Sequence, residues 1–321
     1  MMKICMSVCR PPLPPSQLDF SPTRLNPDIL SLNPHPPKDK VVVIMGATGT
    51  GKSRLSVDLA TRFPAEIINS DKIQAHQGLD IVTNKITAEE SCGVPHHLLG
   101  VLPPNADFTA ANFQQMANLS VESIVSRGKL PIIVGGSNSY VEALVDDDDC
   151  KFRSKYDCCF LWVDVSMPVL QGFVSERVDK MAEKGMVEEV REMFDYSDSD
   201  YTRGIRKAIG VKEFDWYFRA EPFLNNGERE EMLREVIEEI KRNTCALACR
   251  QREKIERLRR VKGWSIQRLD ATAVFRQKGD ADGTWERMVA APSTPAVARF
   301  LLDIASRPLA RGRNMARCLV A

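Results

Sequence analysis

Short apolar runs alternate with segments of helical periodicity over the first half of the chain. The patterns predict four strands, Val41–Met45, Glu66–Asn69, Pro131–Val134 and Cys158–Val165. Between them they predict the helices Lys52–Phe63 and Thr109–Arg127, with Thr109 as N-cap and Gly128 as the stop, and a helix that begins at Pro168. Strands that are apolar throughout and separated by helices indicate an α/β fold, in which helices cover both faces of a parallel sheet.

The sequence from about Gln171 onward has a helical pattern. One long, highly charged segment places apolar residues at helix spacing: Leu233, Ile237, Ile240, Thr244, Leu247, Ile255 and Leu258. A coiled coil is the alternative, but the heptad slips at Gln251. We expect this helix to pack against the sheet domain. The predicted organisation is therefore a leader over 1–38, a phosphate-loop α/β core over 39–170, and a mainly helical region over 171–321.

The leader is rich in Pro and Ser, shows no periodicity, and carries four basic and two acidic side chains. This composition predicts disorder and is compatible with a transit peptide to the plastid, although Asp19 and Asp28 are unusual in one. A flexible tail on a cytoplasmic protein is the alternative.

Composition narrows the class of protein. No apolar run approaches the roughly 18 residues of a membrane span, and a net charge of +1 argues against a protein-wide field for nucleic acid. Nine scattered cysteines fit a reducing compartment, with Cys158, Cys159, Cys245 and Cys249 as buried thiols. The four histidines stand at 35, 76, 96 and 97, so the C-terminal half holds no Cys2His2 zinc finger.

The segment from Gly46 to Ser53 matches the G-x-x-x-x-G-K-[ST] pattern between a strand and a helix. Its residues are Gly46, Ala47, Thr48, Gly49, Thr50, Gly51, Lys52 and Ser53. The glycines let backbone N–H groups surround phosphate oxygens, Lys52 adds a charge, and the Ser53 hydroxyl can hold Mg²⁺. This strand–turn–helix context favours phosphate binding over a glycine-rich turn that binds nothing.

The other predicted strand ends carry few acids of the kind that hold Mg²⁺ in an ATPase. Pro131–Val134 runs into Gly135-Gly136-Ser137, and Asp164 stands alone at its strand end. A small-molecule kinase or a group transferase therefore fits better than a motor or a switch. Asp71 follows the second strand at the edge where the phosphate loop lies, so it can face the ligand or cap a turn.

Seven ordered blocks over residues 41–260 resemble the isopentenyltransferase family. They are Gly46–Ser53, Asn69–Gln74, Asp80–Lys85 with Thr87, Val94–Leu98, Lys129–Ser137 with Tyr140, Ile205–Gly210 and Asn243–Arg252. This family includes tRNA dimethylallyltransferases and the adenylate isopentenyltransferases that start cytokinin synthesis. The resemblance implies that the phosphate loop holds dimethylallyl diphosphate, with ATP or ADP as acceptor.

The resemblance also implies roles for individual residues. Asp71 orients the adenine N6 amine and accepts its proton, and Ser137 stands where the family has a threonine near the bridging oxygen. Arg206 joins the loop in binding diphosphate, with Mg²⁺ on Ser53. The residues implied for acceptor binding are Ser70, Gln74, Thr83, Lys85, Lys207 and Lys212. The helical region is expected to complete the substrate channel.

Other clusters point away from metal and RNA. His96 and His97 are adjacent, so loop packing or one substrate hydrogen bond is favoured over a metal site. Asp146–Asp149 indicates a solvated acidic loop, and the basic run between Arg250 and Arg260 is interrupted by Glu253 and Glu256. Only about a dozen residues follow Leu144 before the next strand, whereas tRNA-acting relatives usually insert several dozen there.

Three hypotheses follow: an enzyme for free adenine nucleotides, a tRNA-modifying enzyme with the same chemistry, and an ATP-dependent small-molecule kinase. The first is preferred, with dimethylallyl diphosphate and ATP or ADP as partners, no nucleic acid, no membrane, and a monomeric state.

Overall fold

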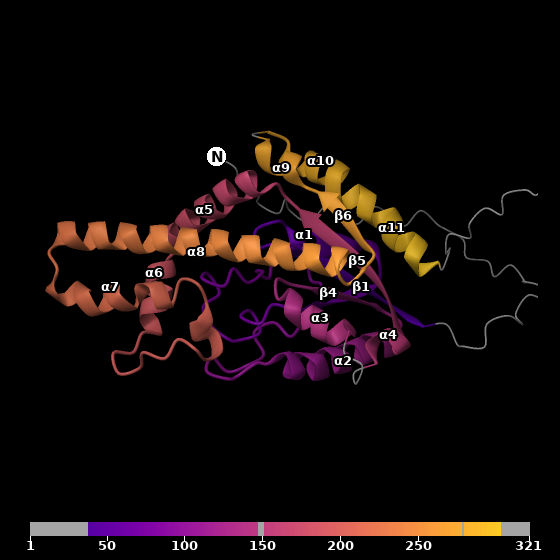
Figure 1. Cartoon of the computed structure of the whole chain (residues 1–321), viewed down its shortest axis with the longest axis horizontal. Coiled ribbons are helices and arrows are strands. Elements are labelled where there is room, and N and C mark those ends of the chain that lie inside the picture. Colours follow the sequence, from indigo (N-terminus) through magenta and orange to yellow (C-terminus); the bar gives the residue numbers. More distant parts are fainter. Residues whose placement is uncertain (1–37, 147–150, 278, 303–321) are drawn as a thin grey trace, which may run out of the picture.

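The computed structural model describes residues 38–146, 151–277 and 279–302 (Figure 1). The expected leader therefore lies outside the described residues apart from Lys38, and so does the expected acidic loop apart from Asp146. None of the helices in these three ranges is both long and apolar enough to cross a membrane.

A six-stranded sheet with the order β3-β2-β4-β1-β5-β6 forms the centre of the fold, and every neighbouring pair is parallel. The strands are β1 (Asp39–Met45), β2 (Ala65–Asn69), β3 (His96–His97), β4 (Leu130–Val134), β5 (Tyr156–Asp164) and β6 (Ile266–Asp270). All four predicted strands are present. The sequence analysis missed β3 and β6, the two edge strands, and β6 lies within the region expected to be helical.

Helices surround the sheet. They are α1 (Lys52–Arg62), α2 (Ala110–Ser126), α3 (Asn138–Asp146), α4 (Phe152–Lys155), α5 (Met167–Glu183), α6 (Met186–Glu192), α7 (Asp215–Ala220), α8 (Asn226–Arg260), α9 (Thr272–Arg276), α10 (Ala281–Trp285) and α11 (Ala291–Leu301). The predicted cap of α2 is confirmed, because the Thr109 hydroxyl accepts a hydrogen bond from the Asn112 N–H at 3.2 Å.

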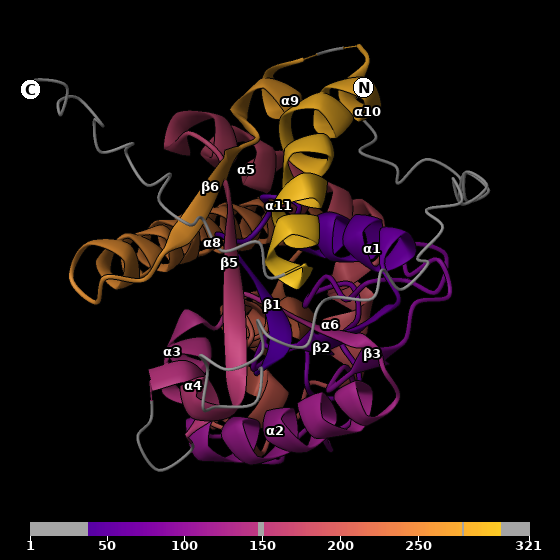
Figure 2. The ribbon, with the colours of Figure 1, turned by 90° about the vertical axis from the view of Figure 1, so that its right-hand side faces the viewer.

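Side chains alternate between the two faces of each strand and so build two cores. Val42 and Ile44 point into one core with residues of α1, the start of α5 and α11. Val41 and Val43 point into the other with residues of α2, α3 and α4. Figure 2 shows α1 and α11 on one side of the sheet and α2 to α4 on the other. The fold is the predicted α/β class, a parallel sheet covered on both faces.

The 35-residue helix α8 joins this sheet domain to a third, all-helical core. Its later part packs on the sheet layer through Ile255 and Leu258, as expected. Its earlier part, with Val236 and Ile240, packs instead with α5, α6 and α7. In Figure 1, this earlier part projects well beyond the sheet.

Candidate active site

A cavity of about 2240 Å³ opens at the edge of the sheet where the strands end. The phosphate loop after β1, the segment after β2 and the Gly135–Ser139 segment after β4 form one wall. Helices α5 and α8 form most of the remainder, together with His96, Trp285 and residues 207–209 and 274–277. The carboxyl edge of a parallel sheet is the usual place for a ligand, and this cavity is large enough for two small substrates together.

The phosphate loop has the backbone that its glycines predict. Gly49 and Gly51 have φ angles of 84° and 93°, in the left-handed region that favours glycine. A Cβ on Gly51 would lie 2.6 Å from the Trp285 ring, so this residue is confined by space as well as by conformation. The loop residues that line the cavity are Thr48, Gly49, Gly51, Lys52 and Ser53. Gly46, Ala47 and Thr50 do not line it, and the latter two are buried.

Trp285 covers the start of α1 from the C-terminal part of the chain. Its indole N–H donates to Asp58 at 2.6 Å, and the Arg54 guanidinium lies 4.8 Å from the centre of the ring. Burial raises the pKa of Asp58, while the hydrogen bond from Trp285 acts in the opposite direction. This aromatic cover holds the first turns of the helix that points its N-terminus into the cavity.

Two partly buried cations, Lys52 and Arg177, lie in the loop wall. The Lys52 ammonium donates to the Ala47 carbonyl at 2.7 Å, and the Arg177 guanidinium donates to the Thr48 hydroxyl at 2.9 Å. Burial lowers the pKa of Lys52 to about 8; the Asp71 carboxylate acts to raise this pKa, and the charge of Arg177 acts to lower it. Burial also lowers the pKa of Arg177, to about 10. The Nε of Arg177 has no hydrogen-bond partner among the described residues. Cations that burial disfavours, with donor capacity to spare, form a site for a polyanion.

The sequence analysis missed Arg177. It lies on α5, the helix that follows β5, and the sequence marks it only as one charged residue among several on that helix. The position of Arg177 on the helix after β5 could have identified it. A helix after a parallel strand starts at the carboxyl edge, so a cation on its inner face can reach the phosphate loop.

Asp71 uses its two carboxylate oxygens differently. Oδ1 accepts hydrogen bonds from the N–H of Ile73 at 3.0 Å and from the N–H of Gln74 at 3.5 Å, so it caps the turn that follows β2. Oδ2 has no hydrogen-bond donor among the described residues and would lie 3.1 Å from a Cβ on Gly136. Asp71 also lines the cavity. The two alternatives left open by the sequence are therefore both present in one side chain.

The loop after β4 fits against the loop after β2 because its first residues have no side chains. A Cβ on Gly135 would lie 2.4 Å from the backbone carbon of Ser70. The hydroxyl oxygen of Ser137 accepts a hydrogen bond from the Lys72 N–H at 3.0 Å. Ser137 lines the cavity and keeps its hydroxyl proton for another acceptor. The structure thus brings Asp71, Ser137 and the phosphate loop to one cavity.

The residues expected to bind the acceptor divide into two groups. Gln74, Thr83 and Lys207 line the cavity. The Gln74 amide donates to the carbonyls of Thr83 at 3.0 Å and Asn84 at 3.1 Å, which fixes that wall. Ser70, Lys85 and Lys212 are absent from the lining. Ser70 is buried behind Gly135, and Lys85 donates to Asp80 at 2.7 Å.

Arg206, expected at the diphosphate, is also absent from the cavity lining. Its side chain is buried and donates to the carbonyls of Asp198 at 2.8 Å and Asp200 at 3.0 Å, and its guanidinium lies over the Tyr201 ring. The carbonyls of its own preceding loop satisfy this arginine, whereas Arg177 reaches the phosphate loop.

Asp164 is absent from the lining of this cavity. It is 2% exposed, accepts a hydrogen bond from Arg268 Nε at 2.7 Å, and lies 3.6 Å from Arg252 Nε. Three His, Cys, Asp or Glu side chains are nowhere grouped as a metal site in the ranges that the structure describes.

The two adjacent histidines diverge, as expected. His97 Nε2 lies 2.7 Å from Glu66, and His96 Nδ1 lies 2.8 Å from the Val94 carbonyl, with His96 also lining the cavity. Burial alone would raise the pKa of Glu66, but hydrogen bonds from Lys129, His97 and Arg127 hold it at about 2. This cluster anchors the β2 edge of the sheet.

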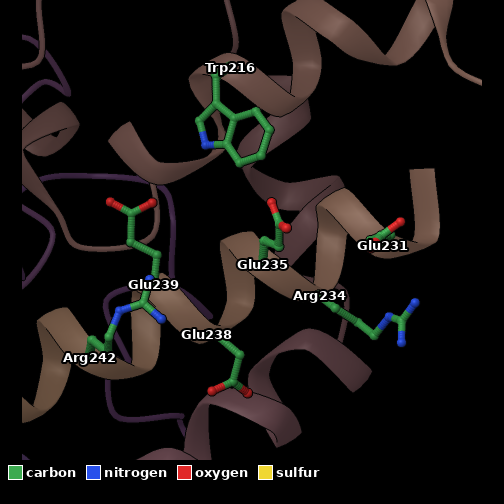
Figure 3. Close-up of a pocket in the computed structure, with 7 residues that line it drawn as sticks. All are labelled: Trp216, Glu231, Arg234, Glu235, Glu238, Glu239 and Arg242. Carbon is green, nitrogen blue, oxygen red and sulfur yellow. The ribbon is translucent and has the colours of Figure 1, made fainter. Parts of the chain in front are cut away.

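A second, smaller cavity of about 540 Å³ lies between α7 and the early part of α8 (Figure 3). Its walls are predominantly acidic, with an exposed tryptophan on one side: Trp216, Glu231, Arg234, Glu235, Glu238, Glu239 and Arg242. Four carboxylates against two guanidinium groups make this cavity unfavourable for a phosphate.

Comparison with known proteins agrees with this geometry. The family model described as IPP transferase matches residues 74–154 and 147–257. Adenylate isopentenyltransferase 3, chloroplastic, from Arabidopsis thaliana is 73% identical over 100% of this chain and 99% of its own length. Adenylate isopentenyltransferase 5, chloroplastic, from the same plant is 57% identical over 94% and 90%.

A solved structure supports the fold. A eukaryotic dimethylallyltransferase that acts on tRNA superposes with a TM-score of 0.70 at 24% identity, over 83% of this chain and 80% of that one. The family match spans more than half of the chain, and the two plant relatives cover nearly all of it. The chain therefore belongs to the IPP transferase family.

Proposed function

We propose that this protein transfers a dimethylallyl group from dimethylallyl diphosphate to N6 of the adenine in free ATP or ADP, the first step of cytokinin synthesis. One observation carries the proposal: Asp71 Oδ2, a carboxylate oxygen without a donor among the described residues, shares a cavity with the partly buried cations Lys52 and Arg177. The names of the two plant relatives support adenylate as the acceptor.

The cationic wall serves the donor. The diphosphate lies against the amides of the phosphate loop, and Lys52 and Arg177 balance the charge that grows as the bond from C1 to the bridging oxygen breaks. In this position the Ser137 hydroxyl donates to a diphosphate oxygen.

The opposite wall serves the acceptor. The exocyclic amine of adenine is a weak nucleophile because its lone pair is delocalised into the ring. Asp71 Oδ2 accepts a hydrogen bond from this amine, aligns it with C1, and takes up its proton as the new C–N bond forms. Diphosphate leaves with the electrons of the broken C–O bond, so charge and protons balance.

We also propose Mg²⁺ as cofactor. The Ser53 hydroxyl is exposed in the cavity and makes no hydrogen bond within the described residues, which suits a single protein ligand beside diphosphate oxygens. When bound, the ion neutralises charge on the diphosphate.

A free nucleotide is preferred over tRNA as the acceptor because the two plant relatives are named adenylate isopentenyltransferases. Lys184, Lys207 and Arg250 are exposed at the walls of the cavity and can meet a polyphosphate chain. Several such cations favour ATP or ADP over AMP. A stem–loop RNA needs a broad basic surface, whereas the next cavity along α8 is acidic.

We propose that the protein works in the plastid, since the two similar plant proteins are named chloroplastic. A cytoplasmic location is the alternative, and imaging of the full chain fused to a fluorescent protein separates the two.

One assay tests the activity. The purified protein receives labelled dimethylallyl diphosphate with AMP, ADP, ATP or unmodified tRNA in parallel reactions, and we expect label in ADP and ATP. Efficient labelling of tRNA with negligible labelling of all nucleotides would overturn the acceptor class. A clear preference for AMP would overturn only the number of phosphates.

A further inference from the structure

Gln251, on the later part of α8, joins two segments of the active site, the phosphate loop and the Gly135–Ser139 segment after β4. Its side-chain oxygen accepts a hydrogen bond from the Thr48 N–H at 2.7 Å, in the phosphate loop. Its side-chain amide donates to the Gly136 carbonyl at 3.0 Å, in the loop after β4. Its own carbonyl accepts from the Asn138 amide at 3.2 Å, at the start of α3.

The fit around this amide leaves no room for a different arrangement. Gln251 is 9% exposed, and a Cβ on Gly136 would lie only 2.4 Å from its Nε2. The same Cβ would lie 3.1 Å from Asp71 Oδ2, so the amide and the carboxylate approach Gly136 together. The backbone at Gly136 is therefore wedged between the helix and the proton acceptor.

Thr48 is held from two directions. Gln251 holds its N–H, and Arg177 donates to its hydroxyl at 2.9 Å. Thr48 belongs to the phosphate loop, and Gly136 lies beside Asp71. The length of the Gln251 side chain therefore sets the distance between the phosphate loop and Asp71. A displacement of about 1 Å between reacting groups can cost about a hundredfold in rate.

We propose that Gln251 is a positioning residue, which holds the diphosphate loop and the Asp71 carboxylate at the separation that prenyl transfer requires. This inference rests on the proposed function. The alternative is that Gln251 only satisfies buried backbone groups between the helix and the sheet, in which case its loss would affect stability and leave kcat unchanged.

Two substitutions separate these roles. Gln251→Met keeps the shape of the side chain and removes both hydrogen bonds. Gln251→Glu keeps an acceptor for the Thr48 N–H but turns a carboxylate oxygen toward the Gly136 carbonyl. A protonated Glu restores the donor, so the damage in this variant must lessen as the pH falls.

We expect kcat to fall by about 10- to 100-fold in Gln251→Met, with the KM of each substrate changed by less than about threefold. The ratio of the Gln251→Glu kcat to the wild-type kcat should rise as the pH falls from about 8 to about 5.5. The corresponding ratio for Gln251→Met should not change with pH. Steady-state kinetics with both substrates and melting temperatures provide the measurements.

Ile255→Val is the matched control, since Ile255 is fully buried one turn further along α8 and lies outside the cavity lining. It should lower the melting temperature and leave kcat unchanged. If Gln251→Met does not fold, the pH profile of Gln251→Glu decides alone. Unchanged kcat in Gln251→Met, or a flat pH ratio in Gln251→Glu, overturns the inference, whereas a wild-type protein that prenylates no nucleotide overturns the proposed function instead.

Discussion

Helix α8 is continuous, but its later part and its earlier part carry different kinds of side chain. From Thr244 to Arg260 the buried face carries apolar side chains, the Thr244 hydroxyl and one amide, Gln251, whose side-chain hydrogen bonds are made to active-site loops. From Asn226 to Asn243 only Val236 and Ile240 are buried, and acidic residues line a cavity on the outside.

The two cavities along this helix differ in the same way. Of these two cavities, only the larger one presents the partly buried cations Lys52 and Arg177 and the phosphate-loop amides to a ligand. Substrates that carry phosphates discriminate between the cavities by charge, so the acidic one is expected to play no part in the reaction. Charge and spare donor capacity, more than volume, identify the site.

The largest effect should come from Asp71→Asn in the larger cavity, which the later part of α8 helps to line. The new side chain still accepts the Ile73 N–H and keeps the turn, but it no longer takes up a proton. We expect turnover to fall by about 10²- to 10⁴-fold, measured with saturating substrates and an unchanged melting temperature. Retention of more than half of wild-type turnover would show that Asp71 is not the base.

Removing the charged side chain of Lys52 or of Arg177 should weaken donor binding selectively. A hydrogen bond to a charged group contributes about 1.5–3 kcal/mol, so Lys52→Ala or Arg177→Ala should reduce the affinity for dimethylallyl diphosphate by about 10- to 100-fold. Separate calorimetric titrations with donor and with ATP provide the test. Loss of ATP affinity with intact donor affinity would favour the kinase hypothesis.

The pH dependence of donor binding should follow Lys52. Burial lowers the pKa of this ammonium to about 8 in the free protein, so it loses its charge above that pH. A bound diphosphate favours the charged form, and binding must then take up a proton. Donor affinity should therefore fall by up to about tenfold per pH unit between about pH 8 and about pH 9.5.

Calorimetry in two buffers of different ionisation enthalpy measures the proton uptake directly. The Lys52→Arg variant should bind with a flatter pH profile because guanidinium stays charged. Donor affinity that is constant over this pH range in the wild type would contradict the assignment of Lys52.

The smallest effect on activity is expected from substitutions in the earlier part of α8. Glu235→Gln and Glu239→Gln change two exposed or half-buried walls of the acidic cavity, far along the helix from Gln251. We expect kcat and both KM values to stay within about twofold and stability within about 0.5 kcal/mol. A large rise in the nucleotide KM would mean that the acceptor reaches this cavity, and the comparison would fail.

The sequence predicted the central strands and the phosphate loop correctly because each of these patterns has a single physical cause. The four central strands are buried on both faces, so their apolar runs identified them, and the glycine spacing located the phosphate loop. The prediction failed for β6 because an edge strand buries only Ile266 and Leu269 and shows no apolar run.

Side-chain partners were harder to predict. Arg206 follows a loop whose carbonyls satisfy it locally, whereas Arg177 comes from a helix distant in sequence. The same is true of Gln251, whose break in the heptad was visible but whose partners, Thr48 and Gly136, lie 203 and 115 residues away. Only the closed fold shows which polar residues meet.

The cover of α1 by Trp285 bears on the order of events as the protein is made. The indole reaches Asp58 across 227 residues of sequence, and β6 joins β5 across more than a hundred. A ribosome-bound chain that already carries the complete phosphate loop still lacks the edge strand β6 and the Trp285 ring that covers the loop at Gly51. Pairings so distant in sequence form slowly, after local helices. The anion site, encoded near the beginning of the described chain, is thus expected to acquire its final shape among the last steps of folding.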